Sequence, residues 1–375
     1  MRRPTALILT AKYGNGHVQA ANVLESHLKQ RDIDPIVSDL FEESYPAFST
    51  ITQSLLIKSY SSHTTFYKWF YYGTNKLNSK GLAQFSSYLG RKRLLELIHQ
   101  YNPSFILLTF PLHAAPSLIK KSRISIPTYT IVTDYCLHPY WMNPYIHHYF
   151  VSSEMVKNCL LNYHISEKRI TISGIPIRSQ FEMPVNKHSV YHKFQLNPYK
   201  KVITILAGAF GVLKNVKELC ELLLHFPTYQ IVVICGKNDS LYKSLQPMAS
   251  LFPVSFRLFG YVEDIHELFA ISNCLITKPG GITLTEATAT KVPLILHHPI
   301  PGQESENAVF FEQKGAALIS HSIFEVVKHV HTVLQNDEIS EKMKIELHHI
   351  YKRDSAAIIV DHAINGMKLP DSKLI

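Results

Sequence analysis

Short runs of β-branched and apolar residues alternate with stretches of helical periodicity along most of the chain. Unbroken or alternating apolar runs predict strands, whereas apolar residues spaced three and four apart predict amphipathic helices. Strands that alternate with helices form βαβ units, in which neighbouring strands run parallel. The strands predicted in this way are residues 6–10, 35–38, 105–109, 128–132, 148–151, 202–207, 230–235, 255–258, 274–277, 293–296 and 316–319.

The length of the chain predicts two such folds in tandem. Its 375 residues exceed what one hydrophobic core usually organises, and 46% of them are apolar, which is enough for two cores. The sequence therefore indicates an α/β protein with two doubly wound parallel sheets. We expect one domain at residues 1–180 and another at 201–375, joined by a linker at 181–200, with the last helix packing back on the first domain.

Positive charge is concentrated in the first half of the chain. Residues 1–180 hold 19 Lys and Arg against 10 Asp and Glu, whereas residues 181–375 hold 19 of each, so the first half carries the whole net charge of +9. Such an excess predicts an acidic partner: a nucleic acid, an anionic membrane surface or a phosphorylated substrate. No recognisable nucleic-acid reading element accompanies it, which argues against nucleic acid. Drift in surface composition would give the same asymmetry.

Cysteine spacing and hydropathy bear on the cellular compartment. The five cysteines form no Cys-x-x-Cys pair and no metal-ligand spacing, which predicts a reducing cytosol and no structural zinc. No apolar run reaches the roughly 18 residues that a transmembrane helix requires. We therefore expect no transmembrane helix, and nothing in the sequence calls for an obligate protein partner.

Aromatic residues interleaved with lysines fill residues 45–90, and Arg91, Lys92 and Arg93 close this segment. Rings such as that of Trp69 can bury at the headgroup boundary of a bilayer while the lysines stay in water. The segment is therefore typical of a membrane-surface contact. A helical hairpin packed on the sheet and a surface for single-stranded nucleic acid are the alternatives.

A glycine-bearing turn follows the first predicted strand. Gly14 and Gly16 flank Asn15, and His17 stands at the start of the next helix. Glycines at such a turn let backbone N–H groups approach a ligand, but a dinucleotide fingerprint would need a third glycine where the chain has Gln19. The imidazole of His17 can act as a general base near neutral pH, and its alternative role is to cap the helix.

A second glycine turn follows a strand of the second half. Gly280 and Gly281 leave backbone amides open to a diphosphate, and Thr283 adds a hydroxyl. Glu286 lies near one turn further on, where a carboxylate can accept ribose hydroxyls. The loop at residues 299–307 carries an amide and carboxylates that suit sugar hydroxyls. All three clusters follow strands at the edge where open α/β sheets bind ligands.

Together these motifs resemble the processive diacylglycerol glycosyltransferases of Gram-positive bacteria, relatives of plant monogalactosyldiacylglycerol synthase and, more distantly, of the peptidoglycan N-acetylglucosaminyltransferase. The similarity extends from Gly14 to about Ala317. It is carried by residues 14–21, 110–113, 133–135 with His138 and Trp141, 173–178, 235–238, 260–262 and the two clusters of the second half.

The resemblance implies a GT-B fold, in which two Rossmann-like domains face each other across a cleft, the first holding a lipid acceptor and the second a UDP-sugar. It implies that His17 removes the acceptor proton, that Gly16 shapes the turn around it, and that His138 and Trp141 lie near anionic lipid. The implied donor contacts are Arg178, Gly280, Gly281 and Thr283 for the diphosphate, Tyr261 and Val262 for uracil, Glu286 for ribose, Gln303, Glu304 and Asn307 for the sugar, and Gly208, Gly211 and Asn215 for the loop that closes over the phosphates.

The implied reaction is an inverting transfer of glucose from UDP-glucose to diacylglycerol and onward to glucosyl-diacylglycerol, at the cytoplasmic face of the cell membrane. The products are β-linked glycolipids of the lipoteichoic-acid anchor type. A helix N-terminus and Arg178 can stabilise the charge that develops on UDP, so we expect no metal ion or other cofactor. UDP-galactose is the alternative donor, and a UDP-sugar sensor without turnover is the alternative function.

Three further positions need separate interpretations. Asp134 ends a predicted strand, where its carboxylate can orient His17, bind an acceptor hydroxyl or cap a turn. Asp32 and Asp34 spell the D-x-D pattern of metal-dependent glycosyltransferases, but they lie between the first helix and the second strand, so we interpret them as a solvated turn. Where relatives carry an acidic residue, this chain has His147-His148, which we expect to add positive potential at low pH.

Overall fold

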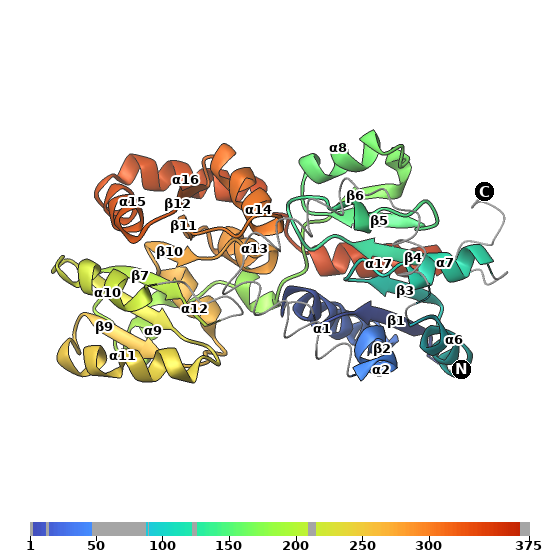
Figure 1. Ribbon diagram of the computed structural model, residues 1–375, viewed down its shortest axis with the longest axis horizontal. Helices are drawn as coiled ribbons and strands as arrows, with labels where there is room; N and C mark the ends of the chain where they lie inside the picture. The colour runs from blue at the N-terminus through green and yellow to red at the C-terminus, as the bar shows by residue number, and fades with distance from the viewer. Residues whose placement is uncertain are drawn as a thin grey trace. The chain divides into compact units, whose positions relative to one another are not determined.

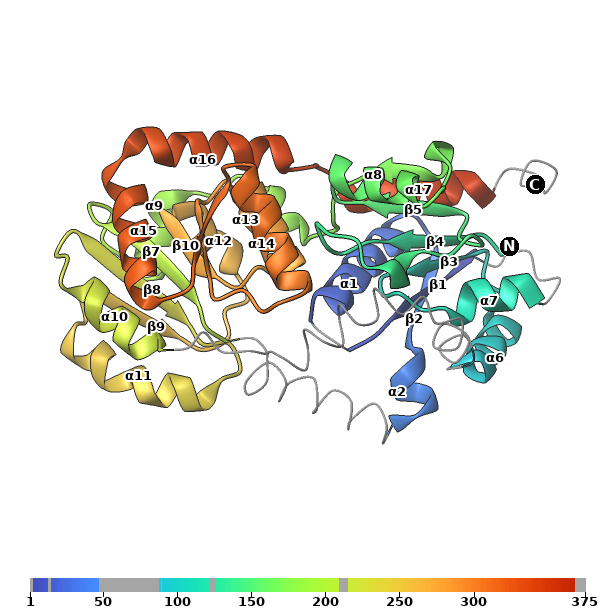
Figure 2. The ribbon, with the colours of Figure 1, turned by 45° about the horizontal axis from the view of Figure 1, so that its top comes forward.

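The computed structural model describes residues 3–12, 15–46, 88, 90–121, 126–208 and 215–367. The chain divides into two compact units (Figures 1 and 2). Unit 1 is Met1–Ile177 together with Lys352–Ile375, and unit 2 is Arg178–Tyr351. Each unit contains a parallel six-stranded sheet with helices packed on both faces.

Unit 1 orders its strands β2-β1-β3-β4-β5-β6, so its first strand lies inside the sheet with a parallel neighbour on each edge. Its elements are β1 (Thr5–Thr10), α1 (Asn15–Gln30), β2 (Asp34–Asp39), α2 (Leu40–Ser44), α6 (Arg91–Tyr101), β3 (Phe105–Leu108), α7 (Ala114–Lys121), β4 (Thr128–Ile131), the 3₁₀ turn η1 (Pro139–Trp141), β5 (His148–Val151), α8 (Glu154–Asn162), η2 (Glu167–Arg169), β6 (Ile170–Ile172) and α17 (Ser355–Met367).

The central strands of unit 1 are buried on both faces, as their unbroken apolar sequence requires. Ala6 and Ile8 of β1 face the core formed with α1 and α17, whereas Leu7 and Leu9 face the core formed with α6, α7 and α8. The last helix thus covers the first sheet, although it follows unit 2 in sequence.

Unit 2 orders its strands β12-β11-β10-β7-β8-β9, and again the first strand lies inside the sheet. Its elements are η3 (Ser179–Glu182), α9 (Lys187–Lys193), β7 (Lys201–Leu206), α10 (Val216–Leu224), β8 (Tyr229–Ile234), α11 (Asp239–Leu251), β9 (Phe256–Phe259), α12 (Ile265–Ile271), β10 (Cys274–Thr277), α13 (Gly281–Thr290), β11 (Leu294–His297), α14 (Gln303–Gln313), β12 (Ala317–Ser320), α15 (Ile323–Gln335) and α16 (Asp337–Ile350).

Alternate residues of β7 face the two cores of unit 2. Ile203 and Ile205 pack with α10, α11 and α15, whereas Val202 packs with α9 and α12. The stretch 181–200, which the sequence analysis treats as a linker, differs from that expectation. It forms α9, and Val190 and Phe194 of this helix region pack in the core that contains Val202 and α12. Removing these apolar side chains from water stabilises the folded state.

The predicted strands of both halves are found within about a residue of their expected bounds, and β6 is the strand that the pattern does not predict. β6 is three residues long, which is too short to show a period. None of the helices in the described part of the chain has the length and hydropathy needed to cross a membrane.

Close backbone contact at Gly208 generates the first prediction. A Cβ atom added there would lie 2.1 Å from both the carbonyl carbon and the carbonyl oxygen of Cys235, and backbone atoms cannot move aside as a side chain can. We expect Gly208→Ala to lower the free energy of unfolding by about 2 kcal/mol or more, measured by chemical denaturation. Gly280→Ala is the matched control, because a Cβ at Gly280 meets nothing within 4 Å. Equal denaturation midpoints for the two variants would contradict the close contact.

Candidate active site

The strand order of unit 1 creates a switch point between β1 and β3. The chain leaves β1 through α1 to form β2 on one edge, and it later returns to form β3 on the other edge. Connections that leave neighbouring strands in opposite directions open a crevice at the carboxyl ends of those strands, where doubly wound sheets bind ligands. His17 lies in the first turn of α1, directly after β1, and Thr109 directly follows β3.

Two threonines fix the orientation of the His17 ring. His17 Nδ1 lies 2.9 Å from the carbonyl oxygen of Thr109 and 2.9 Å from Oγ1 of Thr133. A carbonyl oxygen can only accept a hydrogen bond, so Nδ1 carries the proton and donates it. In the neutral ring, Nε2 therefore holds the lone pair, and the ring presents an acceptor for a proton.

Burial keeps the His17 ring neutral. Desolvation lowers the pKa of His17 to about 4, and the hydrogen bond to the Thr109 carbonyl opposes this effect only in part. Phe110 packs edge-on against the ring with centroids 5.0 Å apart, and the Trp141 ring lies 6.1 Å away. The ring is therefore unprotonated across the whole neutral range, which is the form that a general base requires.

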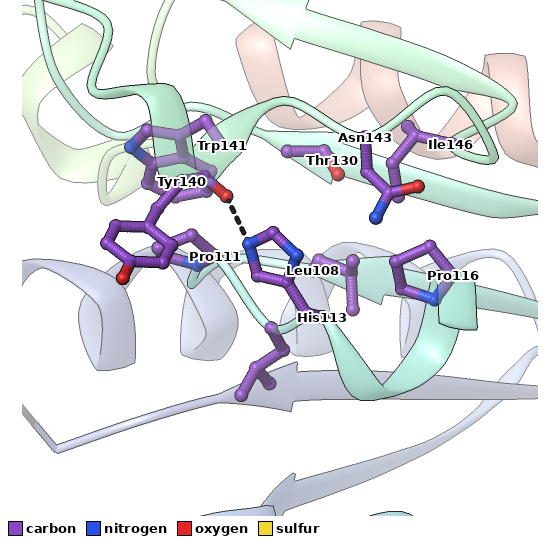
Figure 3. Close-up of a pocket in the computed structure, with 10 residues that line it drawn as sticks. Leu108, Pro111, His113, Pro116, Thr130, Tyr140, Trp141, Asn143 and Ile146 are labelled. Carbon is purple, nitrogen blue, oxygen red and sulfur yellow. Dashed lines mark hydrogen bonds between the residues drawn. The ribbon is translucent and has the colours of Figure 1, made fainter. Parts of the chain in front are cut away.

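A small pocket next to this site is lined by residues from the ends of β3 and β4 and from η1 (Figure 3). His113 points into it and donates from Nε2 to the carbonyl oxygen of Tyr140, at 3.0 Å. Burial lowers the pKa of His113, so this ring is also held neutral by the protein. The resemblance included residues 110–113, but it gave His113 no role, and it gave Thr109 none either.

The other residues expected on the acceptor side occupy different environments. Asp134 is buried, and its backbone carbonyl accepts a hydrogen bond from Ser152 Oγ at 2.7 Å. His138 caps η1, because its Nδ1 accepts from Tyr140 N at 3.2 Å, and its ring stacks on Tyr140. Trp141 is only 5% exposed and belongs to the core of unit 1, with its ring 6.1 Å from that of His17.

Arg91, Lys92 and Arg93 form the first turn of α6. Arg93 forms ion pairs with Glu43 at 2.7 Å and with Glu96 at 3.4 Å, whereas Lys92 is exposed. Trp69 and the other aromatic residues between 47 and 87 lie outside the described residues, as do Gly14 and Gly211. Gly16 belongs to α1, one residue before His17.

His147 and His148 differ from the expectation that they add positive potential. Burial lowers the pKa of both rings, to about 3 for His148, and nearby Arg169 contributes in each case. His148 Nε2 lies 2.8 Å from Thr171 Oγ1, and its ring packs against that of His362 on α17. His148 is therefore a neutral packing group through most of the acidic range, and the lowered pKa of His147 likewise favours its neutral form.

Unit 2 has its own switch point, between β7 and β10. Gly208 follows β7, and the Gly280-Gly281 turn follows β10 and begins α13. Gly280 has φ −76, which any residue can adopt, and no atom lies within 4 Å of the position of its missing Cβ. The fold itself therefore does not demand glycine there, and the open space leaves room for a ligand at the positive end of α13.

Arg178 and Glu286 form an ion pair at this edge. Arg178 Nη2 donates to Glu286 Oε1 at 3.0 Å, and Nε donates to the same oxygen at 3.3 Å. Glu286 is 6% exposed, and burial raises its pKa to about 7 even though Arg178 acts in the opposite direction. The sequence analysis assigned the two residues to different parts of a donor and did not predict their contact.

An ion pair and a hydrogen bond connect the residues at the start of α14 to the Gly280 turn. Lys278 Nζ pairs with Glu304 Oε1 at 2.7 Å, and the fully buried Asn307 donates from Nδ2 to the carbonyl oxygen of Pro279 at 3.1 Å. Gln303 begins α14 and is half-buried. The structure thus brings Gln303, Glu304 and Asn307 to the switch point, and it adds Lys278, for which the sequence motifs predict no role.

The remaining expected donor residues are spread along the same edge of the sheet. Tyr261 follows β9 and is 70% exposed, whereas Val262 packs on the core with α12. Asn215 precedes α10 in the left-handed conformation, with φ 59. Thr283 lies in the first turn of α13 and is half-buried.

The D-x-D sequence begins in the turn after α1, where Asp32 has φ 57 and pairs with Arg3 at 3.2 Å, and it ends at Asp34, the first residue of β2. Ile33 between the two aspartates is buried. In the described ranges, no group of three or more His, Cys, Asp or Glu side chains is arranged to hold a metal ion.

Comparison with known proteins agrees with the two-unit division. Residues 17–177 match the family model described as monogalactosyldiacylglycerol (MGDG) synthase, and residues 189–347 match glycosyl transferases group 1. A Bacillus cytotoxicus protein described as processive diacylglycerol beta-glucosyltransferase is 44% identical over 362 residues, which cover 96% of this chain and 93% of the relative. A Bacillus cereus protein of the same description is 45% identical with the same coverage.

Solved structures share the fold at much lower identity. MurG from Acinetobacter baumannii has a TM-score of 0.64 and 13% identity, covering 96% of this chain and 99% of that one. MnaA from S. aureus, solved with UDP, has a TM-score of 0.63 and 14% identity, covering 98% of each chain. This likeness, with the two parallel sheets, confirms the expected α/β class and GT-B fold.

The protonation state of His17 can be measured directly. We expect the ring to titrate near pH 4 and, when neutral, to carry its proton on Nδ1, because the Thr109 carbonyl can only accept. Since the folded pKa lies below the usual value of about 6.5, this group adds stability above pH 6.5 that is lost as the pH falls through 4. Nitrogen-detected NMR of labelled histidine, assigned with His17→Gln, tests both points. A ring that titrates near 6.5 or is protonated on Nε2 would contradict this geometry.

Proposed function

The chain belongs to the family of processive diacylglycerol β-glucosyltransferases, and we propose that it transfers glucose from UDP-glucose to diacylglycerol and then to glucosyl-diacylglycerol. The observation that carries the proposal is His17 at the switch point of unit 1, with Nδ1 held by Thr109 and Nε2 left to accept a proton. A protein that only binds a UDP-sugar has no use for such a base.

His17 acts on the acceptor hydroxyl. As the acceptor oxygen forms its bond to C1 of glucose, the hydroxyl proton passes to His17 Nε2, and the bond between C1 and the UDP oxygen breaks. The Thr109 carbonyl accepts from Nδ1–H throughout and stabilises the positive ring that forms. Direct displacement inverts the α-linked donor, so the product is a β-glucoside.

Unit 2 binds the donor. The amides at the start of α13 meet the diphosphate in the open space before Gly280, and the helix dipole stabilises the negative charge that develops on UDP. The Glu286 carboxylate accepts from the ribose, the exposed Tyr261 and the partly buried Val262 contact uracil, and Gln303 and Glu304 contact glucose. Because these groups can stabilise the leaving group, we propose that transfer needs no metal ion.

Unit 1 meets the membrane in this proposal. The positive excess of residues 1–180 suits an anionic bilayer surface, and the exposed Lys92 at the start of α6 is one of its contributors. Diacylglycerol would then be taken from the cytoplasmic face without a transmembrane anchor. Neither nucleic acid nor an obligate protein partner is part of the proposal.

A product assay tests the reaction. The chain is incubated with liposomes of diacylglycerol and anionic phospholipid, with UDP-glucose and UDP-galactose in parallel, and the lipids are separated. We expect mono- and diglucosylated diacylglycerol with UDP-glucose, in the presence or absence of EDTA. Galactolipid from UDP-galactose alone would assign the other donor, and UDP binding without any glycolipid would favour a sensor.

His17→Ala gives the sharpest variant in that assay. We expect turnover to fall by about 10²–10⁴-fold, because general-base catalysis contributes a factor of that size, while UDP binding is unchanged. His27→Ala is the matched control, because His27 lies on the same helix and its Nδ1 likewise contacts a backbone carbonyl, that of Val23 at 3.0 Å. Near-normal turnover of His17→Ala would end its assignment as the base.

Membrane docking should depend on salt. We expect binding to anionic liposomes to weaken as salt rises, because attraction between basic residues and lipid decays over a Debye length of about 8 Å at physiological ionic strength. In a cosedimentation assay, Lys92→Gln should bind less than the wild type, whereas Lys342→Gln on α16 of unit 2 should bind like it. Binding that ignores salt, or equal binding of the two variants, would contradict the docking role.

A further inference from the structure

Every nitrogen of the Arg178 guanidinium is held within unit 2. Nη2 and Nε donate to Glu286 Oε1 at 3.0 and 3.3 Å, and Nη1 donates to the carbonyl oxygen of Glu263 at 3.3 Å. Arg178 Cζ also lies over the Phe181 ring, 5.0 Å from the ring centre, in a cation–π contact. Arg178 is therefore a fixed group whose hydrogen bonds run to the protein.

Glu286 needs a counter-ion to remain a carboxylate. Its side chain is 7% exposed, on a helix whose neighbouring residues are buried. A buried carboxyl without a positive partner takes up a proton, and it then loses one of its acceptor oxygens. The contacts of Arg178 go to Oε1, so Oε2 is the oxygen left to accept from a ligand hydroxyl.

From this geometry we infer that Arg178 is a positioning residue for the ribose of the nucleotide: it favours the ionised form of Glu286 and orients the carboxylate so that its second oxygen accepts from a ribose hydroxyl. The inference rests on the proposed function, in which Glu286 meets ribose, and it replaces the assignment of Arg178 to the diphosphate. Removing Arg178 from Glu286 to reach a phosphate would leave a buried charge unpaired, which is strongly unfavourable.

Nucleotides that lack one part of UDP separate the two roles. A positioning role through Glu286 acts only on ligands with ribose hydroxyls, so Arg178→Gln should weaken UDP and UMP by the same factor and should spare 2′,3′-dideoxy-UDP. A diphosphate contact would act on UDP more than on UMP, and it would weaken dideoxy-UDP as much as UDP.

The experiment is isothermal titration calorimetry of the full chain with UDP, UMP and 2′,3′-dideoxy-UDP. We expect Arg178→Gln to weaken UDP about tenfold, the size of a lost hydrogen bond to a charged group. Arg178→Lys should recover part of this affinity, because a lysine keeps the charge but not the paired donors. In a Glu286→Gln background, Arg178→Gln should cause no further loss, because both changes act through one carboxylate.

Arg257→Gln is the matched control, since Arg257 in the same unit donates from Nε and Nη2 to the Gln195 carbonyl. Thermal melts of each variant check folding, and Arg178→Lys carries the test if Arg178→Gln is unstable. Equal losses for UDP and dideoxy-UDP, or unchanged UDP binding, would overturn the inference and leave the product assay to judge the reaction. A wild type that binds no UDP would overturn both proposals.

Discussion

Both sheets depend on pairing their first strand along both edges. β1 lies between β2 and β3, and β7 lies between β8 and β10, so in each unit the chain must leave the first strand toward one edge and come back on the other. Because of that reversal, the loops that follow the two neighbouring strands leave in opposite directions and open a crevice at the carboxyl ends of the strands. One reversal places the His17 turn beside Thr109, and the other places Gly208 near the Gly280 turn. The strand order alone therefore determines where a ligand can bind, and the side chains at that place determine which ligand it is.

Local sequence patterns are sufficient to predict most of these strands and the glycine turns that follow them. The central strands are buried on both faces, so they appear as unbroken apolar runs, and the glycine turns follow them directly. Two elements lacked such a signal. β6 has three residues, and α9 is a seven-residue helix among prolines whose apolar residues become informative only once β7 and α12 are in place. Short elements of this kind obtain their stability from tertiary packing.

The site residues were predicted more completely than their contacts. His17 and Glu286 stand next to glycine turns, which marks them in the sequence. The Thr109 carbonyl that orients His17 is 92 residues away in sequence. Every residue has a backbone carbonyl, so the residue type at position 109 does not predict this contact. Arg178 and Glu286 are 108 residues apart, and both types also suit direct ligand contacts. Only the folded chain shows that each of these groups is held by another part of the protein.

Each unit buries a titratable side chain at its switch point, and the charge state that its surroundings favour differs between the two units. A titratable group that is buried to exclude water tends to become neutral. In unit 1 the His17 ring is desolvated beside Phe110 and Trp141 and faces a carbonyl, so it stays neutral, as its proposed role as a base requires. Unit 2 opposes that tendency in part, because the positive charge of Arg178 favours the carboxylate form of the buried Glu286 and limits the rise of its pKa. A base must be uncharged before it accepts a proton, whereas an acceptor for hydroxyls is stronger when it is charged. The different partners of His17 and Glu286 therefore fit the different chemistry that we propose for them.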